Sequence, residues 1–285
     1  MRGGQIGSGD GAVFSPLPSD EFTAGGSSLV ERFAAACRIA WRLPAFVLLT
    51  FGTAVGFALA APLGSRVRRQ IALAWHRGSC ALVGMRIRVE GYPVVDRPIL
   101  FVANHVSYLD IPILGCWLDT VFVAKREVAG WPGFGTLARL GRTVFVTRKR
   151  QDAATDCHAL SRVLLDGRPA ILFPEGTSTN GLDVLPFRST LFEVAYACTP
   201  DGRVDVQPVT LSYTRAEDGG PSPLAWYGNH DFLSHLLRAF TLPATEVHIR
   251  FHPPLRARRF AGRKALSQHC RAQIVDGLKG LRAAA

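Results

Sequence analysis

A histidine and a carboxylate lie five positions apart in the stretch Asn104–Asp110, directly after the apolar run Ile99–Ala103. An imidazole whose second ring nitrogen is held by a carboxylate can accept a proton from a hydroxyl group. His105 is therefore a candidate general base, and Asp110 is the candidate for the carboxylate that orients it. Because the apolar run predicts a strand, we expect both residues at the carboxyl edge of a sheet.

Whether these two side chains can meet depends on where the following helix begins. Five residues of an ideal helix rotate by about 500°, which leaves the two side chains about 140° apart. The pair can form if residues 105–109 make a turn and the helix begins near Asp110 or Ile111. Pro112 favours such a start, because proline is preferred at the first helical position. The alternative is an ordinary helix cap at Asp110 with His105 as a loop residue.

Three further stretches each carry a weaker signal. Arg148 follows the apolar run 143–147 and could hold a phosphate by two parallel hydrogen bonds, or it is simply a solvated residue among basic neighbours. The turn Pro174–Gly176 allows close approach of backbone to a ligand. Its Glu175 could bind a substrate hydroxyl or organise cations, and the alternative is a surface carboxylate. The stretch Val206–Thr210, apolar but interrupted by proline, has almost no functional signal alone.

The pattern of apolar residues after residue 85 predicts the strands and helices that must position these residues. Apolar runs predict strands at Met85–Glu90, Ile99–Ala103, Thr120–Ala124, Thr143–Thr147, Ala170–Phe173 and Val204–Ser212. Helices are expected at Ile111–Leu118, Phe134–Leu140, Ala153–Asp166 and Ser189–Cys198. This alternation predicts an α/β domain with a mainly parallel sheet flanked by helices. A C-terminal helix that packs on this body is expected from the spacing of Leu266, Cys270, Ile274, Leu278 and Leu281.

An apolar segment without a charge, Leu43–Leu63, precedes this domain. As a helix its 21 residues would extend about 31 Å, which matches the hydrocarbon thickness of a bilayer. A cleaved signal peptide fits poorly, because the run is long and begins more than forty residues into the chain. A transmembrane helix, a helix inserted into one leaflet and a buried core helix stay open, and we favour membrane attachment. A second helix near the membrane is expected over Gln70–Gly84.

The composition limits the partners of this chain. A net charge of +11 favours anionic partners, and no nucleic-acid-binding signature accompanies it, so we expect an anionic membrane surface and no nucleic acid. The six scattered cysteines fit no zinc site and no disulfide framework, which predicts buried, reduced thiols. We expect a flexible tail over residues 1–28, a membrane-associated helical segment over 29–84, and a catalytic α/β domain over 85–285.

In this order, His-x4-Asp, the arginine strand, Pro-Glu-Gly-Thr and the apolar Pro-Val segment resemble the glycerolipid acyltransferase family over roughly residues 70–215. The chain looks most like the bacterial lysophosphatidate (1-acylglycerol-3-phosphate) acyltransferases. The resemblance implies transfer of a fatty acyl group from an acyl-CoA or acyl carrier protein thioester to the free hydroxyl of 1-acylglycerol-3-phosphate. It implies no metal, no other cofactor and no acyl-enzyme. It also implies a place at the inner (cytoplasmic) membrane, with the catalytic domain facing the cytoplasm.

The resemblance also assigns roles residue by residue. His105 matches the general base and Asp110 its orienting carboxylate. Arg148 matches the arginine that binds the acceptor's phosphate. Glu175 and Gly176 match the acceptor-binding turn, which includes Thr177. Apart from the resemblance, the tetrahedral oxyanion needs hydrogen-bond donors, and the candidates are backbone N–H groups or Lys125.

One departure bears on the acceptor. Many phosphatidate-forming members have arginine after Glu-Gly-Thr, where this chain has Ser178. The stretch Ala124–Pro132 together with Glu-Gly-Thr-Ser also resembles the branch that acylates lyso-ornithine lipids, which are zwitterionic and carry no phosphate. Lyso-ornithine lipid is therefore the alternative acceptor. An alternative of another class is a non-catalytic lipid-binding protein of the membrane surface, whereas a serine hydrolase is disfavoured because no Gly-x-Ser-x-Gly elbow occurs.

Overall fold

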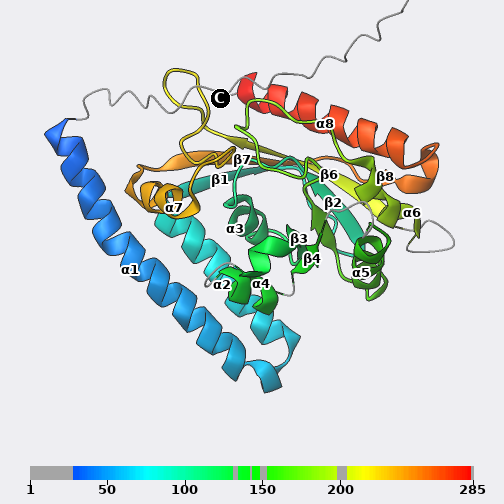
Figure 1. The fold of residues 1–285 in the computed structure, drawn as a ribbon, viewed down its shortest axis with the longest axis horizontal. Helices are drawn as coiled ribbons and strands as arrows, with labels where there is room; N and C mark the ends of the chain where they lie inside the picture. Colours follow the sequence, from blue (N-terminus) through cyan, green and yellow to red (C-terminus); the bar gives the residue numbers. More distant parts are fainter. Residues whose placement is uncertain (1–27, 131–133, 142, 148–152, 198–203, 284–285) are drawn as a thin grey trace, which may run out of the picture.

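A single eight-stranded sheet forms the centre of the computed structural model, which describes residues 28–130, 134–141, 143–147, 153–197 and 204–283 (Figure 1). The strands lie in the order β1-β7-β6-β2-β5-β3-β4, and β8 pairs with β6. Their bounds are β1 Met85–Glu90, β2 Ile99–Ala103, β3 Val121–Lys125, β4 Val144–Val146, β5 Ala170–Leu172, β6 Asp205–Tyr213, β7 Thr245–Phe251 and β8 Leu255–Arg256.

The sheet is mainly parallel, as the alternation of the sequence predicts. Strand β2 lies between β5 and β6 and pairs with both in parallel. The pairs β1–β7, β3–β5 and β3–β4 are parallel too, whereas β7 and β8 pair with β6 in antiparallel fashion. The carboxyl ends of β5, β2 and β6 therefore meet at one edge of the sheet, and the segments that follow them are neighbours in space.

Helices cover both faces of the sheet (Figure 1). The residues of β2 alternate between two apolar clusters, since a strand points successive side chains to opposite faces. Ile99, Phe101 and Ala103 pack with residues of α2, α3 and α7, whereas Leu100 and Val102 pack with residues of α5, α6 and α8. The bounds are α2 Ser65–Val83, α3 Asp110–Gly115, α4 Phe134–Leu140, α5 Ala153–Leu165, α6 Val194–Ala197, α7 Phe232–Thr241 and α8 Arg263–Ala283.

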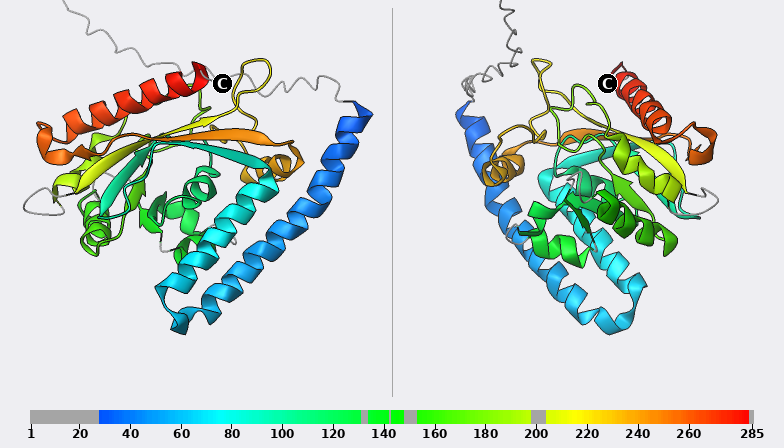
Figure 2. Two further views of the ribbon diagram at one scale, coloured as in Figure 1. Left: turned by 180° about the vertical axis from the view of Figure 1, so that it is seen from behind. Right: turned by 45° about the vertical axis from the view of Figure 1, so that its right-hand side comes forward.

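The N-terminal helix α1, Leu29–Leu59, runs beside α2 as an antiparallel arm that projects from the body of the molecule (Figure 2). It is long and apolar enough to cross a membrane, and only 11% of its 18-residue apolar window is buried inside the protein. Leu48 and Phe51 are 70% and 69% exposed. The reading as a buried core helix is therefore wrong.

Helix α1 begins earlier than the apolar segment that the sequence indicates. The Ser28 hydroxyl accepts a hydrogen bond from the Glu31 N–H, and the Glu31 carboxylate accepts one from the Ser28 N–H, which is a capping box. Pro44 lies inside the helix and does not end it. Helix α2 likewise begins at Ser65 rather than at Gln70.

The predicted strands and helices are present within a few residues of their expected bounds. The stretch expected to be one helix from Ser189 divides into a 3-10 turn, Ser189–Glu193, and the short α6. Elements α7, β7 and β8 were not predicted. The expectation of buried thiols is wrong for Cys37, which is exposed; the described cysteines are all free, and Cys198 lies outside the described residues.

Candidate active site

The segment between β2 and α3 has the turn that the His105–Asp110 pair requires. Helix α3 begins at Asp110, and the Asp110 N–H donates to the Ser107 carbonyl over 3.0 Å. Pro112 is the third helical residue rather than the first. It breaks no helical hydrogen bond there, because the first four N–H groups of a helix have no partner within it. The prediction that this helix begins near Asp110 is confirmed.

The Asp110 carboxylate lies at the centre of the site and is fully buried. Its Oδ2 lies 2.7 Å from His105 Nδ1 and accepts the N–H groups of Val106 and Ser107 over 2.8 Å and 3.2 Å. The Tyr213 hydroxyl donates to Oδ1 over 2.6 Å. Burial, and then Asp110 itself, raise the pKa of Tyr213 well above its usual value, so this hydroxyl keeps its proton.

This environment determines the form of the imidazole that can act. A carboxylate oxygen facing Nδ1 requires that Nδ1 carry the proton, so the neutral ring has its lone pair on Nε2. The ring stacks on Phe173 with centroids 4.3 Å apart, and the Thr179 N–H donates to the His105 carbonyl over 2.9 Å. His105 is thus fixed in the orientation and tautomer of a general base.

Glu175 follows β5, the parallel neighbour of β2, and contacts the histidine through the backbone. Its Oε1 accepts the His105 N–H over 2.7 Å, and its Oε2 accepts the Leu185 N–H over 2.7 Å. The reading as a surface carboxylate is wrong, because Glu175 is only 4% exposed. Burial raises the pKa of Glu175 to about 7, although the two N–H donors oppose that rise.

The turn that carries Glu175 needs a glycine next to it. Gly176 has a φ of 78°, a left-handed conformation that costs other residues about 1–2 kcal/mol. A Cβ at this position would also lie 2.7 Å from Arg188 Nε. The Arg188 guanidinium therefore packs directly over the turn and places a cation beside it.

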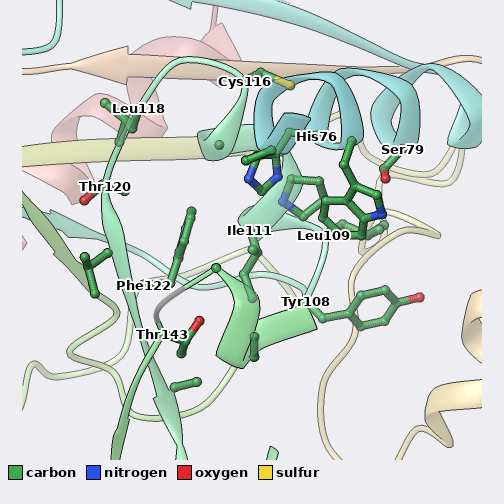
Figure 3. A pocket seen from close by; sticks show the side chains of 18 of the residues that line it. His76, Ser79, Tyr108, Leu109, Ile111, Cys116, Leu118, Thr120, Phe122 and Thr143 are labelled. Atoms are coloured by element: carbon green, nitrogen blue, oxygen red, sulfur yellow. The ribbon is translucent and has the colours of Figure 1, made fainter. Parts of the chain in front are cut away.

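A cavity of about 1170 Å³ adjoins the pair. His105, Gly176, Thr177 and Ser178 line it, and Figure 3 shows its wall where His76 of α2, Ile111 of α3 and Phe122 of β3 gather around it. Most of the lining side chains are apolar. The cavity combines a wall suited to hydrocarbon with a general base at its surface, which is an arrangement for a lipid substrate.

The structure does not describe the side chains of two predicted site residues, Arg148 and Lys125. Arg148 lies outside the described residues. The strand before it, β4, is separated from β2 by β5 and β3, which corresponds to about 14 Å across the sheet. Lys125 is the last residue of β3, and its side chain lies outside the description. Among the described residues, no group of three His, Cys, Asp or Glu side chains could hold a metal ion.

Three contributors to the site escaped prediction. Tyr213 lies at the end of β6, 103 positions beyond the carboxylate that it contacts. The Asn104 side chain donates to the Leu211 carbonyl over 2.9 Å and accepts the Leu211 N–H over 2.8 Å, which ties the end of β2 to β6. The third contributor is the backbone N–H of Leu185, and the type of a residue does not show that its backbone will take part in a site. For Asn104, the signal was a polar amide immediately after an apolar strand.

The fold and the site define a class of enzyme: an α/β protein with a general base oriented by a carboxylate, beside an apolar cavity. The acyltransferase family model matches residues 86–212, which contain the pair and the Glu175 turn. A lyso-ornithine lipid O-acyltransferase of Rhizobium meliloti is 39% identical over 232 residues, which cover 76% of this chain and 79% of that protein. The 1-acyl-sn-glycerol-3-phosphate acyltransferase of Neisseria gonorrhoeae is 36% identical over 153 residues, covering 52% and 57%.

A solved structure has the same fold. The crystal structure of the 1-acyl-sn-glycerophosphate acyltransferase of Thermotoga maritima superposes with a TM-score of 0.69 at 20% identity, covering 89% of this chain and 98% of that one. The chain belongs to the acyltransferase family, and it is an acyltransferase.

Proposed function

We propose that this chain transfers a fatty acyl group from an acyl thioester to the free hydroxyl of lyso-ornithine lipid. The observation that carries the proposal is the 2.7 Å contact between His105 Nδ1 and the buried Asp110 carboxylate, at the wall of an apolar cavity. An alcohol is a weak nucleophile until a base takes its proton during the attack. The non-catalytic alternative provides no reason for a buried carboxylate that orients an imidazole.

The reaction can be written on these residues. His105 Nε2 accepts the proton of the acceptor hydroxyl as its oxygen attacks the thioester carbonyl. The tetrahedral intermediate then collapses, the carbon–sulfur bond breaks, and the thiolate takes a proton from the imidazolium. The Asp110 carboxylate stabilises the imidazolium while it exists. The intermediate's oxyanion needs N–H donors, and Lys125 stays our candidate for one of them.

The choice of acceptor has support from the relatives and from the turn. A second lyso-ornithine lipid O-acyltransferase, from Rhodobacter capsulatus, is 38% identical and matches 70% of this chain, whereas the relative from Neisseria gonorrhoeae matches about half of it. Ser178 lines the cavity. It stands at the position after Glu-Gly-Thr where many phosphatidate-forming members of the family have arginine. Fewer cations at the acceptor turn suit a zwitterionic headgroup better than a phosphate monoester.

Lysophosphatidate is the second candidate acceptor. The observation that favours it is Arg188, whose guanidinium lies over Gly176 and could pair with a phosphate. Arg148, the other cation of this kind, is the residue that we would assign to the same phosphate. Lysophosphatidate would use these arginines to bind its phosphate, whereas lyso-ornithine lipid has no phosphate that needs them.

The donor and the place of reaction complete the proposal. We propose an acyl-CoA or an acyl carrier protein thioester as the donor, with no metal or other cofactor. The arm formed by α1 and α2 would insert its exposed apolar face into the inner membrane, with the α/β domain on the cytoplasmic side. The net charge of +11 suits both an anionic membrane and an acidic carrier protein.

An acceptor-competition assay tests this function. The purified protein, in vesicles of anionic lipid, receives a radiolabelled acyl thioester with equal concentrations of lyso-ornithine lipid and lysophosphatidate. We expect ornithine lipid as the main labelled product. Labelled phosphatidate as the main product would give the function to the second candidate. No labelled product from either acceptor would favour the non-catalytic alternative.

A further inference from the structure

We propose that Arg271 of the C-terminal helix α8 is a positioning residue for Glu175, acting through the peptide group that joins Val184 to Leu185. Only the activity readout of this inference rests on the proposed acyl transfer. Two arginines of α8 bind carbonyl groups of the loop after the Glu175 turn, and one of them contacts the peptide that donates to this carboxylate.

The contacts of Arg271 form a fork on two consecutive carbonyls. Its Nη2 donates to the Val184 carbonyl over 2.5 Å, and its Nε donates to the Leu185 carbonyl over 3.0 Å. About three turns further along α8, Arg282 donates from Nη1 to the Leu182 carbonyl over 2.6 Å and from Nη2 to the Gly181 carbonyl. The fixed planar guanidinium suits such paired acceptors, and lysine does not reproduce it.

The Val184 carbonyl and the Leu185 N–H belong to the same peptide group. That N–H donates to Glu175 Oε2 over 2.7 Å, while Glu175 Oε1 accepts the His105 N–H over 2.7 Å. A peptide whose oxygen accepts a charged donor becomes a stronger donor at its nitrogen. Arg271 is therefore linked to the backbone of the catalytic histidine through one peptide group and one carboxylate.

The loop needs this support because it has no regular secondary structure. No strand or helix covers residues 174–188, all of which the structure describes, so no strand partner satisfies their carbonyl groups. The loop also contacts the histidine turn at Gly181, where an added Cβ would lie 3.0 Å from Val106 Cγ1. A shift of the loop would thus displace both Glu175 and the turn that carries His105.

Helix α8 is a rigid base for this contact. Leu266, Cys270 and Ile274 are fully buried in the apolar cluster beneath the sheet face that α8 covers. Arg271 follows directly after Cys270, so its Cα is fixed by that packing. Side chains that extend from a rigid element hold a site more precisely than loop residues do.

The sign of the electrostatic effect follows from the groups around Glu175. His105 favours its ionised form, and Asp110 disfavours it. Arg188 packs over the adjacent Gly176, and Arg271 reaches Glu175 through the Leu185 N–H. Removing the Arg271 guanidinium weakens that N–H as a donor, so the carboxylate holds its proton to a higher pH.

The experiment compares Arg271→Gln and Arg271→Lys with Arg263→Gln in the full chain. Arg263 lies on the same helix and pairs with exposed Glu193, which makes it a matched control. For Arg271→Gln we expect the acid limb of acyl transfer to move up by about 0.5–1 pH unit and the KM for the acceptor to rise. Arg271→Lys should restore part of the shift, and the control should leave both unchanged.

A second readout does not depend on activity. The amide nitrogen and proton shifts of Leu185, whose N–H donates to Glu175, report the titration of Glu175 when they are followed against pH by NMR. Their midpoint should rise by the same amount in Arg271→Gln. An unmoved midpoint in a folded variant overturns the positioning role, even if its melting temperature falls. Absence of acyl transfer by the wild type, with a shifted midpoint, would contradict the proposed function and leave the positioning role supported.

Discussion

Replacement of Asp110 by asparagine removes one charge from the site and leaves its shape. The asparagine oxygen can take the place of Oδ2, which accepts from His105, Val106 and Ser107, and its amide can donate to the Tyr213 oxygen. All four contacts can therefore persist between neutral groups. We expect a loss of unfolding free energy of only about 1–3 kcal/mol, because weaker hydrogen bonds are offset by the removal of a buried charge.

The effect on catalysis should be larger. The imidazolium that forms during proton transfer faces the carboxylate at 2.7 Å between Nδ1 and Oδ2, so the two charge centres lie about 4 Å apart. At an effective dielectric constant of about 20, this attraction is worth about 4 kcal/mol. Since about 1.4 kcal/mol corresponds to a factor of ten, kcat should fall by about 10³.

The assay measures kcat at saturating acceptor, with the fold checked by circular dichroism and thermal melting. Tyr213→Phe is the matched control, because it removes one donor to Asp110 and keeps the carboxylate. We expect this control to lose less than about tenfold in kcat. A folded Asp110→Asn protein with kcat within about threefold of the wild type would refute the reasoning.

Three further predictions concern the turn and the N-terminal arm. The raised pKa of Glu175, about 7 against an ordinary 4.5, means that its ionisation is costlier in the folded state. As pH rises from about 4.5 to 7, the free energy of unfolding of the wild type should therefore fall by about 2–3 kcal/mol relative to that of Glu175→Gln. Urea denaturation measures both proteins over this range. Free energies of unfolding that change with pH in parallel in the two proteins would contradict this. Gly176→Ala should lower the unfolding free energy by at least about 1–2 kcal/mol, measured by thermal melting, because its φ is 78°. The double variant Leu48→Asp, Phe51→Asp should no longer sediment with anionic vesicles. The control Leu165→Asp, which replaces a 60% exposed leucine on α5, should still sediment with them. Equal binding by the two variants would contradict insertion of α1.

The sequence predicted the local part of the active site because that part depends on neighbours along the chain. An apolar strand, a following turn and a proline near the helix start determine how His105 meets Asp110. The same holds for Glu175, whose turn follows an apolar strand. Parallel strands then bring the two turns to one edge of the sheet.

The remainder of the site depends on contacts between distant parts of the chain. Tyr213 reaches Asp110 only because β6 pairs with β2, and no local feature marks its hydroxyl as a donor. The Leu185 N–H and the Arg271 guanidinium act through backbone groups, which carry no residue-specific signal. Strand β7 could have been predicted from the sequence, because Val247, Ile249 and Phe251 alternate with polar residues over Thr245–Phe251.

Helix α1 begins at Leu29, where the expected helical segment 29–84 begins, and well before the apolar run Leu43–Leu63. Its first turns carry Glu31 and several arginines, which look like a polar flank outside the apolar segment. Arg42 is nevertheless buried, and its Nη1 donates to the Phe240 and Leu242 carbonyls over 3.3 Å and 2.8 Å. These carbonyls at the end of α7 compensate a charge that would otherwise favour solvent.

The most direct test of the account is the initial rate of acyl transfer to lyso-ornithine lipid by His105→Ala, measured against the wild type at equal amounts of folded protein. If His105 is the general base, the rate should fall by about 10²–10⁴ while thermal melting stays close to that of the wild type. An undiminished rate in the folded variant would contradict the central claim that the His105–Asp110 pair activates the acceptor hydroxyl.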